Sequence, residues 1–116
     1  MTRVIMHGCN GKMGQMITSI IAEDPEVEIV AGIDVSNHIV NTYPVFADIA
    51  ECDVEADVVI DFCIASAIDG LLDYCTARQI PCVLCTTGLS EAQLVKVEET
   101  SKTVAVLKSA NMSLGV

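Results

Sequence analysis

Three glycines near the start of the chain have the spacing of a phosphate-binding turn. They lie in Gly8-Cys9-Asn10-Gly11-Lys12-Met13-Gly14, between an apolar run at residues 2–7 and a stretch with helical spacing. The first N–H groups of a helix are unpaired and carry the positive end of its dipole, so a pyrophosphate can bind there. Gly11 would let the anion approach the backbone, and Gly14 would let the helix pack closely on the strand. The alternative is a tight turn that binds no ligand.

An acidic residue stands at the expected end of the second strand. Asp34 follows the apolar run at residues 27–33 and falls twenty residues after Gly14. At that position a carboxylate can accept a hydrogen bond from the 2′-hydroxyl of an adenosine ribose. Its charge would repel a 2′-phosphate, and Val35 follows where an arginine would help, so this pair of residues favours NADH over NADPH. The alternative is a solvated aspartate at a strand end.

Two more polar segments end later apolar runs. They are Cys85-Thr86-Thr87-Gly88 and Ser109-Ala110-Asn111-Met112-Ser113. Small hydroxyl side chains and a glycine allow a nicotinamide ribose or a substrate carboxylate to come close to the backbone. Either segment can also be a plain connection, and Ser90 after the first has the character of a helix N-cap.

The remaining polar residues do not predict a second site. Cys82 and Cys85 have C-x-x-C spacing, but three positions along one strand direct them to opposite faces, so we expect small buried hydrophobes. His7 and His38 are isolated, and we expect His7 to line a strand end without a catalytic role. The acids between residues 48 and 57 fit a solvated face. We therefore predict no metal site.

Two hydrophobic periods alternate along the chain and predict an α/β fold. Expected strands lie at residues 2–7, 27–33, 58–62, 81–86 and 104–108, and expected helices at 11–23, 65–79 and 90–101. A short strand within residues 35–47 and a short helix near 48–53 are further possibilities. The nearly all-apolar strands indicate a parallel sheet with helices on both faces.

Right-handed crossovers favour strand order 3-2-1-4-5 in a Rossmann-like, doubly wound, three-layer αβα fold. With five strands counted, residues 81–86 form the fourth strand and flank the first at the switch point where ligands bind. We expect one dinucleotide-binding domain over residues 1–116. Its last elements are expected to be missing, because the segment near Val116 is apolar and has no polar tail.

The charge balance disfavours several classes of partner. Sixteen acidic and six scattered basic residues give a formal charge of −10, which repels nucleic acid and anionic membranes. Residues 1–8 read as a strand rather than a signal peptide, so the six cysteines are expected to be reduced thiols in the cytoplasm. Aromatic residues make up only 3% of the chain, which predicts an aliphatic core.

In combination, these segments resemble 4-hydroxy-tetrahydrodipicolinate reductase (dihydrodipicolinate reductase), a family of lysine and diaminopimelate biosynthesis. The matching pieces are Gly8-x-x-Gly11-x-Met13-Gly14, Val59-Ile60-Asp61-Phe62, Thr86-Thr87-Gly88-Leu89-Ser90 and Asn111-Met112-Ser113-x-Gly115-Val116. The chain departs from the family pattern at Cys63, Cys85 and Met112, where threonine, glycine and phenylalanine are usual, and at Val35, where arginine is frequent. This last change leaves NADPH preference open.

The resemblance implies an amino-terminal domain that binds NADH or NADPH. It assigns the pyrophosphate to Gly8, Cys9, Asn10, Gly11, Lys12 and Met13, and the adenosine ribose to Asp34. It assigns the nicotinamide half to Phe62, Cys85, Thr86 and Thr87, with Ser109, Ala110, Asn111 and Met112 closing the site. Thr87 is also implied to meet a substrate carboxylate.

The parent reaction implied is reduction of a cyclic dicarboxylate, made from aspartate semialdehyde and pyruvate, to tetrahydrodipicolinate. The family's substrate-binding and proton-donating motif, and its tetramer contacts, belong to a following domain. We therefore expect no catalytic residue in this chain, no turnover by it alone, and a homotetrameric parent. The alternatives are a free-standing Rossmann module that senses a nucleotide, or a domain of another small dehydrogenase of amino-acid metabolism.

Overall fold

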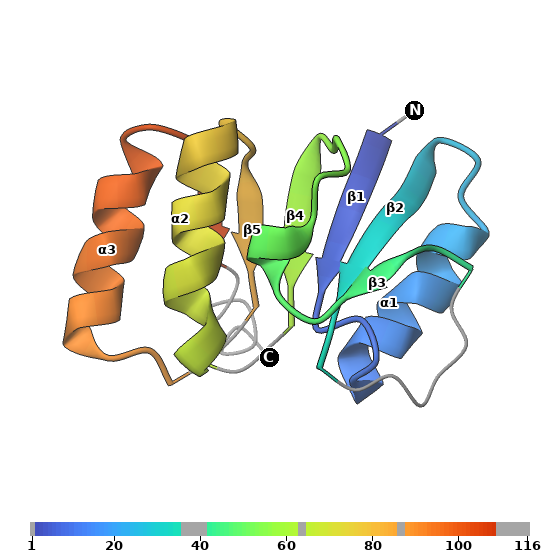
Figure 1. The fold of residues 1–116 in the computed structure, drawn as a ribbon, viewed down its shortest axis with the longest axis horizontal. Coiled ribbons are helices and arrows are strands. Elements are labelled where there is room, and N and C mark those ends of the chain that lie inside the picture. The colour runs from blue at the N-terminus through green and yellow to red at the C-terminus, as the bar shows by residue number, and fades with distance from the viewer. Residues whose placement is uncertain (1, 36–41, 63–64, 86–87, 109–116) are drawn as a thin grey trace, which may run out of the picture.

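A computed structural model describes residues 2–35, 42–62, 65–85 and 88–108 of the chain. Within these ranges a six-stranded sheet packs against three α-helices (Figure 1). The strands are β1 (Thr2–His7), β2 (Val27–Ile33), β3 (Val45–Phe46), β4 (Val58–Asp61), β5 (Cys82–Leu84) and β6 (Val106–Lys108). The helices are α1 (Lys12–Ala22), α2 (Ile68–Arg78) and α3 (Glu91–Ser101), with short 3-10 turns η1 (Ile49–Glu51) and η2 (Ala65–Ala67).

The sheet is parallel throughout, with the strand order β3-β2-β1-β4-β5-β6. This confirms the predicted doubly wound topology and adds a sixth strand. One detail of the prediction was wrong: the strand beside β1 at the switch point is β4, not the run at residues 81–86. The two-residue strand β3 takes the third position, so residues 82–84 become β5 and lie one strand farther away.

Alternate residues of the strands enter two separate cores. On one face Ile5 and Val59 pack with the buried side chains of α2. On the other face Val4 and Met6 pack with Ile17 and the rest of the inward side of α1. Helices α2 and α3 therefore cover one side of the sheet and α1 the other, which confirms the three predicted layers (Figure 1).

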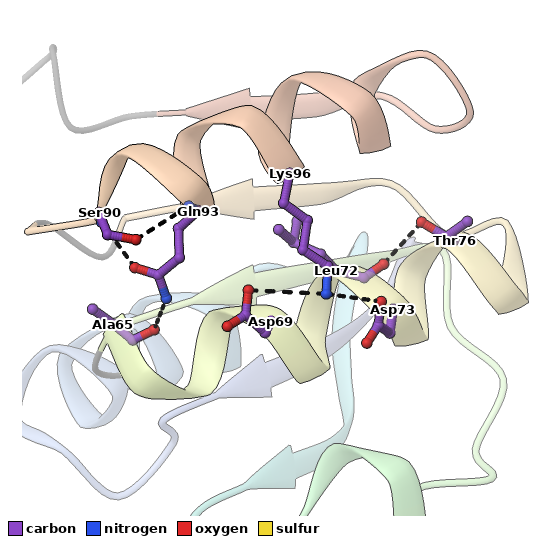
Figure 2. A network of polar contacts seen from close by, with 8 residues as sticks. All are labelled: Ala65, Asp69, Leu72, Asp73, Thr76, Ser90, Gln93 and Lys96. Atoms are coloured by element: carbon purple, nitrogen blue, oxygen red, sulfur yellow. Dashed lines mark hydrogen bonds and ion pairs between the residues drawn. The ribbon is translucent and has the colours of Figure 1, made fainter.

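The start of α3 is fixed by a reciprocal cap. The Ser90 hydroxyl accepts a hydrogen bond from the Gln93 backbone N–H at 3.2 Å, and the Gln93 amide oxygen accepts one from Ser90 N–H at 2.9 Å. The Gln93 amide nitrogen also donates to the Ala65 carbonyl at 2.6 Å (Figure 2). The cap thereby connects α3 to the segment that leads from β4 into α2. The predicted N-cap role of Ser90 is confirmed.

Gly14 lies where no side chain fits. A Cβ atom at Gly14 would overlap the Gly8 carbonyl oxygen and would lie 2.8 Å from the Cys9 Cα atom. Both neighbours are backbone atoms, so the crowding cannot be relieved by a rotamer change. The expectation that Gly14 permits close packing of the first helix on the first strand is confirmed.

Gly14→Ala is therefore expected to lower the free energy of unfolding by about 2–4 kcal/mol, because the backbone of the loop must move. Gly70→Ala is the matched control, since a Cβ atom there meets nothing within 4 Å. In the first turn of α2, where alanine favours the helix more than glycine does, it should raise stability by up to about 1 kcal/mol. Urea unfolding followed by circular dichroism measures both. Equal effects of the two substitutions would contradict the packing argument.

Candidate functional site

The glycine loop turns over the end of β1 and leads directly into α1. Gly8 has a φ of 90°, its N–H donates to the Ile33 carbonyl at 2.7 Å, and its own carbonyl accepts from Gly11 N–H at 3.2 Å. Among the residues that the structure describes, no side chain caps α1, and its first turn contains no acidic residue. This helix start is therefore suited to an anion.

Gly11, unlike Gly14, is not required by the packing of the chain. A Cβ atom built on Gly11 has the Gly8 carbonyl oxygen as its nearest neighbour, at an ordinary 3.5 Å. Gly11 is also exposed. The space beside its Cα atom is thus open, as a group approaching the backbone from outside would need.

Asp34 contacts the loop, as its position after β2 predicts. Its Oδ2 atom accepts a hydrogen bond from the Asn10 backbone N–H at 2.9 Å. Asn10 itself is buried, and its carbonyl accepts from the Gln15 side chain on α1 at 3.0 Å. Asp34 therefore holds the loop against the end of β2 and remains half-buried at the rim.

A cavity of about 350 Å³ opens beside Asp34. Its wall is formed by the ends of β1 and β2, the approach to η1, and the segment from η2 into α2. Its lining residues are His7, Ile33, Asp34, Val35, Ala47, Asp48, Ile49, Ser66, Ala67 and Gly70. A second cavity of about 260 Å³, between α1 and β2, includes none of the predicted site residues.

Cys9 faces the protein interior rather than the loop surface. Its side chain is fully buried in the core under α1, in space left by Gly32, where a Cβ atom would lie 2.5 Å from the Cys9 sulfur. Burial raises the pKa of the Cys9 thiol from 9.0 to about 11. Only the backbone of Cys9 is thus left to take part in the predicted phosphate turn.

The other predicted residues divide into two groups. Lys12 and Met13 are exposed at the start of α1. Phe62 and Cys85 are half-buried and follow β4 and β5 at the same edge of the sheet, where Phe62 N–H donates to the His7 carbonyl and Cys85 N–H to the Asp61 carbonyl. The predicted residues Thr86, Thr87, Ser109, Ala110, Asn111 and Met112 lie outside the described residues.

The sequence analysis did not predict a buried contact between a histidine and an aspartate. His7 Nδ1 lies 2.7 Å from Asp61 Oδ1, and both side chains are buried. The prediction that His7 lines a strand end is confirmed, but its partner was not foreseen. The available signal was that two apolar strands each end in a polar residue. Only the strand order shows that these residues are opposite each other.

Cys82 is buried in the core under α2, and Cys85 is half-buried just after the end of β5. That the two side chains point to opposite faces stays a prediction. Within the described ranges, no group of three His, Cys, Asp or Glu side chains is placed to hold a metal ion. None of the helices in those ranges is long and apolar enough to cross a membrane.

Comparison with known proteins identifies the family. Residues 2–112 match the family model described as "Dihydrodipicolinate reductase, N-terminus". The chain belongs to this family. The match covers nearly the whole chain and confirms the resemblance seen in the sequence motifs.

Curated relatives agree. The chain is 50% identical over 116 residues to the 4-hydroxy-tetrahydrodipicolinate reductase of Caldanaerobacter subterraneus subsp. tengcongensis. It is 51% identical over 116 residues to the enzyme of the same name from Clostridium novyi. In both comparisons all of this chain aligns with 46% of the relative. The chain thus spans a little less than half the length of these relatives.

Solved structures share the fold. A dipicolinate-bound dihydrodipicolinate reductase from Paenisporosarcina sp. TG-14 superposes with a TM-score of 0.74 at 24% identity, over 87% of this chain and 44% of that one. Homoserine dehydrogenase from S. aureus gives a TM-score of 0.75 at 15% identity, over 92% of this chain and 31% of that one. At these identities the superpositions support the Rossmann-like architecture.

The buried Cys9 thiol should react slowly. At pH 8 a thiol with a pKa of about 11 is roughly a hundredfold less ionised than one with a pKa of 9, and the thiolate is the reactive form. Iodoacetamide should therefore modify Cys9 at least roughly a hundredfold more slowly in the folded chain than in urea, as measured by mass spectrometry of the Cys9 peptide. Because the Cys9 pKa is about 11 in the folded chain and 9.0 in the unfolded chain, the unfolded chain loses this proton first. The free energy of unfolding is therefore unaffected by Cys9 below pH 9 and falls as pH rises from 9 toward 11. Equal modification rates in the two states would contradict the placement of Cys9.

Proposed function

We propose that this chain is the NAD(P)H-binding domain of a 4-hydroxy-tetrahydrodipicolinate reductase. The observation that carries the proposal is the convergence of three features at one edge of the sheet: the open backbone at Gly11, the uncapped start of α1 and the carboxylate of Asp34. A dinucleotide needs these features together, because it presents a pyrophosphate and a ribose diol a fixed distance apart. The family match supports the same assignment.

The pyrophosphate would lie on the loop from Gly8 to Met13. Its oxygens would accept hydrogen bonds from the N–H groups of the first turn of α1, where the helix dipole favours negative charge. Gly11 would let an oxygen come within bonding distance of the backbone. Lys12, exposed beside the loop, would add a positive charge.

The adenosine would lie along the 350 Å³ cavity. Asp34 borders this cavity while one of its oxygens holds Asn10, and a carboxylate has acceptor capacity for a ribose hydroxyl as well. Apolar lining from Val35, Ile49 and Ala67 suits the faces of a purine ring. The carboxylate opposes a 2′-phosphate, so this arrangement favours NADH over NADPH.

The nicotinamide would lie toward Phe62 and Cys85, with Thr86, Thr87 and the segment from Ser109 to Met112 completing that half. When bound, the cofactor supplies a hydride to the cyclic dicarboxylate, and Thr87 would meet one of the substrate carboxylates. We assign the substrate-binding and proton-donating groups to the half of the relatives' length that this chain does not span. The chain by itself would then bind cofactor without turnover, and the parent would be a cytoplasmic homotetramer.

Calorimetric titration with NADH and NADPH tests the proposal. The chain should bind NADH saturably, and Gly11→Ala should weaken binding by about tenfold or more, equivalent to about 1.4 kcal/mol. The methyl group would occupy the approach path of the phosphate while clearing the chain's own atoms.

Val95→Ala is the control, because Val95 is an exposed residue of α3. In Figure 1, α3 lies at the opposite end of the sheet from α1. It should leave affinity unchanged. If the folded chain bound neither nucleotide, the proposal would fail for this chain. If Gly11→Ala and Val95→Ala bound NADH equally well, the assignment of the pyrophosphate to the glycine loop would fail.

A further inference from the structure

One side chain joins two of the connections that leave the sheet at the proposed cofactor edge. Gln93, in the first turn of α3, accepts from Ser90 N–H at 2.9 Å through its amide oxygen and donates to the Ala65 carbonyl at 2.6 Å through its amide nitrogen (Figure 2). Ser90 ends the connection from β5 to α3, and Ala65 lies in the connection from β4 to α2. The hydrogen bond from Gln93 to Ala65 therefore ties these two connections together.

The Gln93 amide is held in one orientation. Its oxygen is bound within the cap, and the Gln93 backbone N–H donates to the Ser90 hydroxyl at 3.2 Å. Leu89, which precedes the cap residue, packs against the core under α2. The Gln93 side chain cannot turn away from Ala65 without breaking the cap, so it acts as a spacer of fixed length between the two connections.

The connections that Gln93 joins carry residues of both halves of the proposed site. They start at the carboxyl ends of β4 and β5, which are neighbouring strands. The first continues into η2, where Ser66 and Ala67 form part of the wall of the 350 Å³ cavity that we assign to adenosine. The second includes Thr86 and Thr87 in its sequence, which we assign to the nicotinamide half. The distance between these segments therefore bears on a ligand that reaches from one half to the other.

A second contact joins the same helices at a different place. Lys96 Nζ, one turn later on α3, lies 3.0 Å from Asp73 Oδ1 and 3.9 Å from Asp69 Oδ1, both on α2 (Figure 2). These ion pairs connect the bodies of the two helices and involve neither connection. They provide a comparison for the effect of loosening α3 from α2 in general.

We propose that Gln93 is a positioning residue for the cofactor, because its hydrogen bond to Ala65 sets the spacing between the nicotinamide segment and the wall of the adenosine cavity. This inference rests on the proposed cofactor-binding function. A dinucleotide has a fixed length and gains the contacts of both halves only where their spacing fits it. A spacing set before binding lowers the cost of ordering the second half. Without the bond, the adenosine and pyrophosphate contacts would remain, and the nicotinamide would add less to the affinity.

Gln93→Glu removes the bond to Ala65 and keeps the cap. A glutamate at this position can still accept from Ser90 N–H, as in the usual capping box. An ionised carboxylate has no proton to donate to the Ala65 carbonyl. Lys96→Met is the matched control, because it changes the charge of α3 by the same one unit and removes the ion pairs to Asp69 and Asp73. Circular dichroism and thermal unfolding confirm that each variant is folded.

The test measures the dissociation constants of NADH and ADP-ribose by calorimetry for the wild-type chain and both variants. ADP-ribose has the same adenosine and pyrophosphate but lacks the nicotinamide ring, so repulsion by the added glutamate charge cancels in the ratio of the two constants. The wild-type chain should bind NADH more tightly than ADP-ribose. Gln93→Glu should reduce this advantage by about threefold to tenfold, the range expected for the loss of one hydrogen bond. Lys96→Met should retain the wild-type ratio.

An unchanged ratio in Gln93→Glu, or the same reduction in both variants, would overturn the role of Gln93 and leave the cofactor site intact. Equal affinity of the wild-type chain for NADH and ADP-ribose would also overturn it, because the nicotinamide half would then contribute nothing that needs positioning. If the folded wild-type chain bound neither ligand, the proposed function itself would fail, and this inference with it.

Discussion

The structure depends on the close contact between the start of α1 and the end of β1. The backbone of Gly8 and Cys9 occupies the space that a side chain at Gly14 would need, so the helix can approach only with glycine there. This approach brings the first turn of α1 over the edge of the sheet and sets the path of the loop between them. This close approach determines where Gly11 lies and how the N–H groups at the start of α1 are directed. It also brings the Asn10 backbone within hydrogen-bond distance of Asp34.

To bind an anionic cofactor, the charges and dipoles at the start of α1 must overcome repulsion by the net negative charge of the chain. A net charge of −10 repels an anionic cofactor at long range, and salt weakens that repulsion beyond about 10 Å. At close range the first turn of α1 contains no acidic residue, and no side chain within the described ranges caps it, so the positive end of the helix dipole is available to an anion. The polar contacts of Asp34 with the loop and of Gln93 with Ala65 hold the surrounding segments in place. A preorganised edge of this kind can bind an anion despite an acidic surface.

Sequence periodicity predicted the features that arise from neighbours in the chain, and missed those that arise between distant strands. The spacing of apolar residues predicted the strands and helices, and the type of residue at Ser90 predicted the start of α3. Both signals depend only on residues that are close together in the chain. The buried His7–Asp61 pair joins residues 54 positions apart and depends on which strand pairs with β1. The two-residue strand β3 is too short for a periodic signal. Without β3 in the count, residues 81–86 were predicted to be the fourth strand and to lie beside β1, the place that β4 takes in the structure. The inward turn of Cys9 likewise depends on Gly32, from another strand.

The most direct test of the account is to map which residues of the chain a nicotinamide dinucleotide contacts. Nitrogen-15 amide spectra recorded during titration with NADH would locate it residue by residue. The account predicts that the largest shift changes fall on Gly11, Met13 and Gly14, at the start of α1, and on Asp34. The amides of Val27 and Asp57, at the opposite edge of the sheet, should remain in place. Saturable changes centred on Val27 and Asp57, with the glycine loop unaffected, would contradict the central claim.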